Sequence, residues 1–265
     1  MTGQSLAGGS ATLNGDTITI GTLVSGVDFA ATDKSGGSLI LNTSSPDTGA
    51  MTLVANGGSI TADQLVSGGN LTAKAGLDIA YNSLQSFAAA ALHAVQGTIS
   101  LDHETVAKGD LTLTLNSLDL SHDRGRLATA GTLIVHASDA DLSHSTLTFG
   151  GIALNLSGSV DASGTKLSAV TTDGGSGDIA INARTITTTS ATAILAANDL
   201  TLTLASLVNA GQLAANRDLT FNIAGSFTNT PSGLVYAGRD GRLFVAGDLV
   251  NDQGAILVGN DLTIA

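Results

Sequence analysis

The stretch Asn198-Asp199-Leu200-Thr201-Leu202 returns nineteen residues later as Arg217-Asp218-Leu219-Thr220-Phe221, and again as Asn260-Asp261-Leu262-Thr263-Ile264. In each copy apolar and polar residues alternate, which is the period of a β-strand. A repeat of about twenty residues cannot bury its apolar face alone, so equivalent strands are expected to stack on one another. The repeated pentapeptide therefore predicts a solenoid of short strands.

Related pentapeptides occur upstream and between these copies. Their first apolar residues, taken in order, are 71, 111, 133, 152, 179, 200, 219, 243 and 262, with steps of 40, 22, 19, 27, 21, 19, 24 and 19. The long step divides at Leu92 into 21 and 19, although residues 88–91 are all Ala, which makes an Ala-rich helix the competing interpretation. Ile18 and Leu39, 21 residues apart, extend the period towards the N-terminus.

The turns and the composition agree with such a fold. Gly, Asn and Asp separate the apolar runs, and these residues accept the backbone conformations of tight turns. Aromatic residues make up only 3% of the chain and 33 residues are Gly, so the core is built from small and β-branched side chains. We predict an all-β parallel β-helix, or β-solenoid, of about a dozen coils of roughly 19–22 residues.

The whole chain is expected to form one elongated β-helix domain over residues 1–265, with divergent coils at 16–197 and regular repeats at 198–265. Its net charge of −12 argues against nucleic acid or an anionic membrane as a partner. The chain contains no Cys and no apolar run of about 18 residues, so neither a disulfide nor a transmembrane segment is expected. A signal peptide is also missing, which suggests either a cytosolic protein or an internal piece of a much longer chain.

Three asparagines indicate the register of the last coils. Asn209, Asn229 and Asn251 each follow an apolar-X pair, at steps of 20 and 22 residues. Amides at one turn of successive coils are expected to stack as a ladder. We therefore assign these three residues a structural role.

A second pattern falls in the middle of the chain. Asp119-Leu120-Ser121-His122 is repeated as Asp141-Leu142-Ser143-His144, with His103 one coil earlier and Asp161 one coil later. Stacked histidines suit a transition metal and stacked carboxylates a hard cation, but solvated turn residues are the more ordinary interpretation. We predict no metal and no cofactor, and we regard a tentative surface recognition patch as the alternative, composed of Asp119, His122, Arg124, Asp141 and His144.

Catalytic patterns are weak in this sequence. Parallel β-helices include polysaccharide lyases and hydrolases, but these need carboxylates in a groove walled by long loops. The longest excess here is the 27-residue coil that contains 171–177, which is expected to be a flexible surface loop. Arg217, Arg239 and Arg242 suggest either a small basic spot or ion pairs with Asp218, Asp240 and Asp248. We predict that the chain is not an enzyme.

The segment 198–265 resembles filamentous haemagglutinin repeats, which pair an Asn-X-Gly-X-Leu/Ile turn with a Gly/Arg/Asn-Asp-Leu-Thr strand. The resemblance rests on 209–220 and on the related runs 229–245 and 251–264, and it is looser over 16–197. Such repeats occur in large exoproteins of two-partner secretion systems, including adhesins and the stalks of contact-dependent growth-inhibition toxins. The resemblance implies a right-handed β-helix, export through an outer-membrane transporter, and a secreted location at the bacterial cell surface.

The expected function is therefore a structural fibre segment of a surface-displayed exoprotein that mediates adhesion or presents a toxin. Two alternatives remain. The first is a section of the same fibre that binds a cell-surface protein or glycan receptor. The second is a polysaccharide-active β-helix enzyme.

Overall fold

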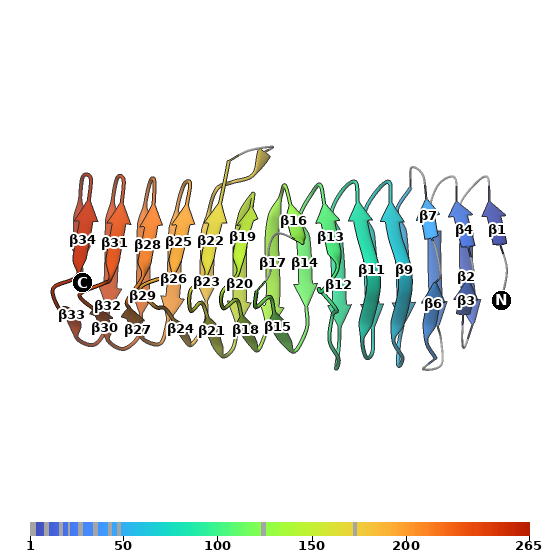
Figure 1. Ribbon diagram of the computed structural model, residues 1–265, viewed down its shortest axis with the longest axis horizontal. Coiled ribbons are helices and arrows are strands. Elements are labelled where there is room, and N and C mark those ends of the chain that lie inside the picture. Colours follow the sequence, from blue (N-terminus) through green and yellow to red (C-terminus); the bar gives the residue numbers. More distant parts are fainter. Residues whose placement is uncertain are drawn as a thin grey trace. The chain divides into compact units, whose positions relative to one another are not determined.

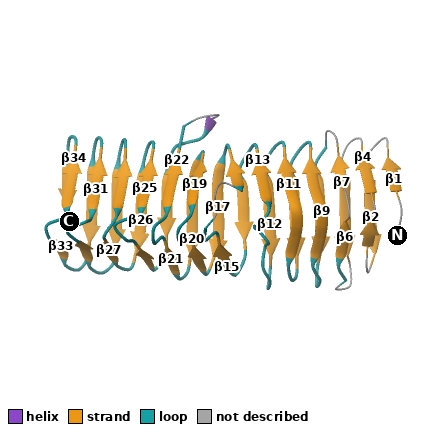
Figure 2. Ribbon diagram, in the orientation of Figure 1, coloured by secondary structure: helices purple, strands orange, loops and turns teal. Residues whose placement is uncertain are grey.

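A computed structural model describes residues 4–7, 11–15, 18–20, 22–25, 29–33, 37–41, 44–46, 49–122, 126–171 and 174–265. These residues form an all-β parallel β-solenoid of about ten turns (Figure 1). They contain no α-helix, and the one helical colour in Figure 2 belongs to a 3-10 turn at Gly174. The predicted parallel β-solenoid is confirmed.

The chain divides into two compact units, which are described separately. Unit 1 comprises Met1–Asn116 and Arg126–Thr129, and unit 2 comprises Ser117–Gly125 and Ala130–Ala265. Strand pairing inside each unit is parallel throughout, with partners about twenty residues apart in sequence. Every strand therefore hydrogen-bonds to its own equivalent in the next coil.

Unit 1 contains two sheets, so each of its coils runs through two faces. The first sheet has the order β1-β4-β7-β9-β11-β13-β16, with β3 and β6 joining it at β9. Its strands are β1 (Gln4–Ala7), β3 (Ile18–Ile20), β4 (Thr22–Ser25), β6 (Leu39–Leu41), β7 (Ser44–Pro46), β9 (Ile60–Ser67), β11 (Ile79–Ser86), β13 (Glu104–Ala107) and β16 (Leu127–Thr129). The strands of the second, in order, are β2 (Ala11–Gly15), β5 (Phe29–Asp33), β8 (Met51–Ala55), β10 (Leu71–Ala75), β12 (Ala90–Ala94) and β14 (Leu111–Thr114).

Unit 2 contains three sheets, so each coil turns three times. The first comprises β17 (Thr132–Ala137), β20 (Gly151–Leu156), β23 (Ile179–Asn182), β26 (Leu200–Leu204), β29 (Leu219–Ile223), β32 (Gly241–Val245) and β35 (Leu262–Ile264). The second comprises β15 (Ser117–Asp119), β18 (Asp139–Asp141), β21 (Ser159–Asp161), β24 (Thr185–Thr187), β27 (Leu207–Asn209), β30 (Phe227–Asn229) and β33 (Leu249–Asn251). The third comprises β19 (Thr146–Phe149), β22 (Lys166–Ala169), β25 (Ala193–Ala196), β28 (Gln212–Ala215), β31 (Leu234–Ala237) and β34 (Ala255–Val258).

The core of each unit follows from the alternation seen in the sequence. In β10 and β26 every second residue is buried and the residues between point outwards. The buried positions are mostly Leu, Ile and Ala, and Phe221 and Phe227 of unit 2 meet edge to face at 5.7 Å between ring centroids. Burying one large aliphatic side chain stabilises a fold by roughly 1.5–3 kcal/mol, so the columns of aliphatic residues hold the coils together.

Two positions in the predicted alignment are wrong by two residues. Leu71 pairs with Ala90, not with Leu92, and Leu219 pairs with Gly241, not with Leu243. A shift of two keeps each side chain on the same face, so the aliphatic pattern alone cannot detect it. The Ala-rich segment is the strand β12 and not a helix, because its backbone pairs with β10 and β14 on either side. Ile18 and Leu39 do pair as the period predicts.

Candidate functional site

One turn of unit 2, the turn that follows each strand of its second sheet, contains most of the predicted site residues. Strand register aligns Asp119, Asp141, Asp161, Thr187, Val208, Thr228 and Val250. The residues that follow them form what we call the turn column, namely Leu120, Leu142, Ala162, Thr188, Asn209, Asn229 and Asn251. Its chemistry changes from aliphatic to amide along the unit.

The three asparagines at the end of the turn column stack as a ladder. The Nδ2 of Asn209 donates to the Oδ1 of Asn229 at 2.9 Å, and the Nδ2 of Asn229 donates to the Oδ1 of Asn251 at 2.8 Å. Asn209 and Asn229 are fully buried. Each amide also holds its own turn, because Asn229 donates to the carbonyl of Gly233 at 3.2 Å and Asn209 accepts from the N–H of Gly211 at 3.1 Å.

Glycines after the ladder leave room for the amides. A Cβ at Gly233 would lie 2.2 Å from the Oδ1 of Asn229 and 2.5 Å from the backbone carbonyl oxygen of Asn209. A Cβ at Gly254 would lie 2.3 Å from the Nδ2 of Asn229. Gly233 and Gly254 therefore leave room for the ladder, because a larger residue at either position would clash with the amide of Asn229.

Upstream, the same turn is held from outside by aspartate. The Oδ1 atoms of Asp119, Asp141 and Asp161 each accept from the backbone N–H two residues later, at 2.9 Å. This is an Asx turn, in which a carboxylate replaces a backbone carbonyl. The stacked carboxylates thus have a structural task in every coil where the turn column is aliphatic.

Inside these upstream turns, buried hydroxyls take the place of the amides. Ser145 and Thr165 both donate to the carbonyl of Leu142 at 2.5 Å, and Thr192 donates to that of Ala162 at 2.7 Å. All three hydroxyl residues are buried. Sequence reasoning missed them, although their spacing of 20 and 27 residues follows the coil steps.

The two histidines of the predicted patch lie against each other. The rings of His122 and His144 are stacked, with centroids 5.2 Å apart and planes 14° from parallel. Ring nitrogens bind metals along directions in the ring plane, so two nearly parallel rings do not converge on one ion in this arrangement. Arg124 lies outside the described residues, and His103 belongs to unit 1.

Both histidines adopt a left-handed backbone conformation. Their φ angles are 60° for His122 and 56° for His144, and the equivalent position in the next coil is Gly164 with φ 66°. A residue with a Cβ pays roughly 1–2 kcal/mol for this conformation, whereas glycine does not. The imidazoles therefore occupy a turn position that a glycine would fill with less strain.

Arginines of the last coils pair with aspartates across coils. Arg217 binds Asp199 through two nitrogens, with Nε to Oδ1 at 2.7 Å, and Arg239 binds Asp218 in the same way. Arg239 and Arg242 also face Asp240 at 3.5 and 3.8 Å. The sequence suggested Asp218 as the partner of Arg217, but Arg217 pairs with Asp199 of the preceding coil. It can do so because the distance between coils is shorter than an arginine side chain.

These ion pairs shift the titration of the aspartates. The hydrogen bond from Arg217 lowers the pKa of Asp199, and the hydrogen bond from Arg239 lowers the pKa of Asp218. Each carboxylate also accepts the backbone N–H of the Asp in the next coil, at 3.1 Å for Asp199 and 3.3 Å for Asp218. The aspartates offset the charge of Arg217, Arg239 and Arg242, so these arginines do not form an unpaired basic spot.

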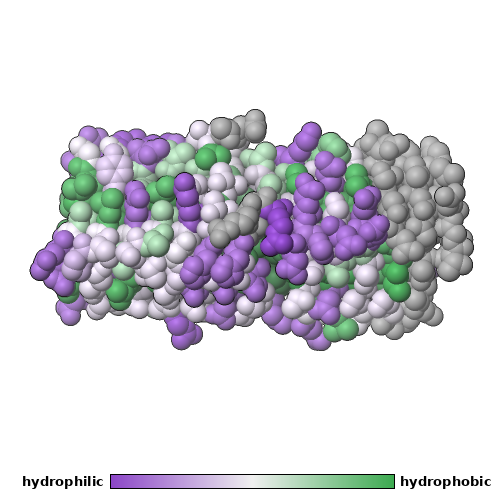
Figure 3. Space-filling view, in the orientation of Figure 1, coloured by the Kyte–Doolittle hydropathy of each residue, from purple (hydrophilic) through white to green (hydrophobic). Residues whose placement is uncertain are grey.

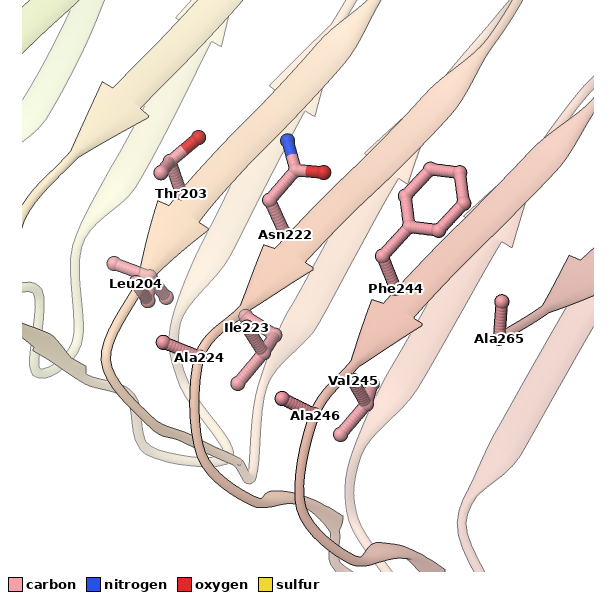
Figure 4. A pocket seen from close by; sticks show the side chains of 9 residues that line it. All are labelled: Thr203, Leu204, Asn222, Ile223, Ala224, Phe244, Val245, Ala246 and Ala265. Carbon is pink, nitrogen blue, oxygen red and sulfur yellow. The ribbon is translucent and has the colours of Figure 1, made fainter.

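The described surface of each unit has a hollow. In unit 2, a groove of about 430 Å³ runs across β26, β29 and β32, where Figure 4 shows Thr203, Asn222 and Phe244 side by side. Its lining is mainly apolar. In unit 1, a groove of about 310 Å³ crosses β6, β9 and β11 and is lined by Asp63, Asn82 and His103 among others.

Comparison with protein-family models, curated protein sequences and solved structures gives no match. Among the described residues, no group of three or more His, Asp or Glu side chains is placed to hold a metal ion. In the same part of the chain, no helix is long and apolar enough to cross a membrane. The expectations of no enzyme activity, of a secreted location and of a transporter partner stay predictions.

We expect Asn229→Ala to destabilise unit 2. The change removes the donor to Asn251, Gly233 and Ala255, and each buried group left unpaired costs about 1–3 kcal/mol. Urea unfolding followed by circular dichroism measures the loss. The outward-facing Thr228→Ala is the matched control, expected within about 0.5 kcal/mol of the native chain. Equal losses for the two variants would show that the ladder is not structural.

We expect His144→Gly to be more stable than His144→Ala by about 1 kcal/mol. Both changes remove the stacked ring, but only glycine relieves the left-handed backbone at φ 56°. Thermal unfolding of the two variants beside the native chain measures the difference. If alanine is tolerated as well as glycine, the backbone at this turn is not strained.

Stability should depend on pH through Asp218. Its pKa is lowered in the folded state, so ionisation stabilises the fold above about pH 3.9, and this stabilisation is lost as pH falls through the lowered pKa. Arg239→Gln should therefore lower stability at pH 7 and flatten its decline between about pH 5 and pH 2. Arg184→Gln is the control, because it removes the same charge elsewhere in unit 2. The measurement is the free energy of unfolding as a function of pH. If this free energy falls equally steeply with acid in the native chain and in Arg239→Gln, the assignment to Asp218 is wrong.

Proposed function

We propose that the chain is a structural fibre segment of a secreted, surface-displayed bacterial exoprotein. The observation that supports this best is the turn column, in which each coil satisfies the polar groups of the next. In the last coils, Asn209 and Asn229 each donate to the asparagine of the coil beyond as well as to a carbonyl of their own turn. A protein built this way gains interactions with every added coil, which suits a spacer whose length can vary.

The second support is the resemblance of 198–265 to filamentous haemagglutinin repeats. The Asn-X-Gly turn and the Asp-Leu-Thr strand on which it rests are the residues that form the ladder and the β26 to β29 register. On this proposal the chain crosses the outer membrane through a two-partner secretion transporter. It then extends an adhesin or a toxin from the cell surface.

Deleting one coil tests the spacer role. Removal of 207–226 joins Ser206 to Phe227 and keeps register, since Leu207 pairs with Phe227. Removal of 207–216 is the control, because it deletes half a coil and breaks register. The chain fused behind a two-partner secretion domain, with its transporter, should appear at the surface when intact or lacking 207–226, but not when lacking 207–216. Failure of the intact chain to be exported, or equal loss in both deletions, would refute the spacer role.

The alternative, a receptor-binding section, is favoured by the strained histidine pair. The rings of His122 and His144 are exposed, and the next coil shows that Gly serves the same turn. Under this alternative, the chain binds target cells and the double variant His122→Gly/His144→Gly loses that binding while the fold is kept. The spacer role predicts no effect of this double variant on cell binding.

A further inference from the structure

The polar groove of unit 1 carries an inference that goes beyond the spacer role and does not depend on it. The groove lies where three coils bring their outer faces together: Ile40 and Leu41 come from β6, Thr61 to Asp63 from β9, and Ala80 to Asn82 from β11. Ser100 and His103, which follow β12, close it. Figure 3 shows hydrophilic side chains gathered over β9, β11 and β13 of this unit.

The polar side chains of the groove offer both donors and acceptors. The Nδ2 of Asn82 donates to the Oδ1 of Asp63 at 2.9 Å, which orients the two groups toward each other. One amide N–H and the amide oxygen of Asn82, and the second carboxylate oxygen of Asp63, keep capacity for a ligand. The exposed imidazole of His103 and the hydroxyls of Thr61 and Ser100 add further groups of both kinds.

Apolar and polar side chains alternate on the floor of the groove. Ile40, which is 39% exposed, and Ala80 both pair with Thr61, one coil on either side of it, and Ala62 is buried. Tyr81 lines the same floor but is only 3% exposed, and its hydroxyl is turned inwards to the hydroxyl of Thr105 at 2.7 Å. Burial raises the pKa of Tyr81 to about 12, so the ring contributes an uncharged wall.

We propose that this groove binds one residue of a neutral saccharide. A sugar ring presents C–H faces that suit the exposed side chain of Ile40, and its hydroxyls both donate and accept, as Asp63, Asn82 and His103 require. An anionic ligand would meet the carboxylate of Asp63. The volume of about 310 Å³ lies at the lower end of the range for small-molecule sites, which fits one ring and not a long chain.

The test is titration of the whole chain with neutral mono- and disaccharides, including hexoses and N-acetylhexosamines, followed by NMR line broadening of the sugar. We expect at least one sugar to bind with a Kd near 1 mM, the affinity of a small, open site. Asp63→Ala and Asn82→Ala should each weaken binding at least tenfold. Gln85→Ala is the matched control, because Gln85 is an exposed amide on the same strand, outside the groove, and it should leave binding unchanged.

Circular dichroism shows whether the variants keep the solenoid; Asp63 and Asn82 are exposed, so both are expected to do so. Three results would overturn the proposal: no saccharide bound at 20-fold the expected Kd, binding that survives both alanine variants, or binding of Ca²⁺ alone at Asp63. The coil-deletion experiment reads surface export and removes residues of unit 2. The export experiment therefore tests the spacer role alone, and the sugar titration tests the saccharide groove alone.

Discussion

The parallel stacking of equivalent residues is the constraint on which both units depend. Since each backbone strand pairs with its own equivalent about twenty residues later, a side chain meets mainly the side chains of its own column. A polar residue buried in such a column finds its partners in the neighbouring coils and within its own turn. Columns therefore tend to keep one chemistry over several coils, and a change of chemistry needs compensating changes at nearby positions in the same turn.

The turn column of unit 2 shows such a change. An outer aspartate closes the turn where the column contains Leu120, Leu142 and Ala162. In the turns of Leu142 and Ala162, an inner hydroxyl also satisfies the carbonyl of the column residue. Where the column contains asparagine, the amide performs both tasks, the outer position becomes Val or Thr, and the inner position becomes glycine. Thr188 lies between the two arrangements and uses both ends of its hydroxyl, accepting from the N–H of Ala210 at 2.9 Å and donating to the carbonyl of Val208 at 3.2 Å.

The sequence predicts the period and the strand positions well, because inward and outward residues alternate in nearly every strand. It does not predict register where the column residue is unusual: Ala90 and Gly241 occupy positions that Leu92 and Leu243 seemed to fill, since a shift of two keeps the same face inward. Partners across coils were also missed. Arg217 pairs with Asp199, 18 residues away, and Thr165 bonds to Leu142, 23 residues away. Ser145 bonds to the same carbonyl from within the turn. The stacking of the coils, which the sequence does not show directly, brings these groups together. The unit 1 groove had no signal at all, because its lining comes from four separate coils.

At the two histidines, a column keeps one residue type although the backbone there is strained. In the Asp-Leu-Ser-His turns the left-handed residue carries a ring, whereas the following coil reaches the same conformation with Gly164. The ring of His144 lies over Gly164, with its Cδ2 at 3.3 Å from where a Cβ would stand, so a side chain at position 164 would lie in close contact with this ring. A histidine there would extend the stack by one ring. The histidine stack ends at Gly164, because this residue adopts the left-handed conformation without the strain of a Cβ and carries no ring for His144 to stack on.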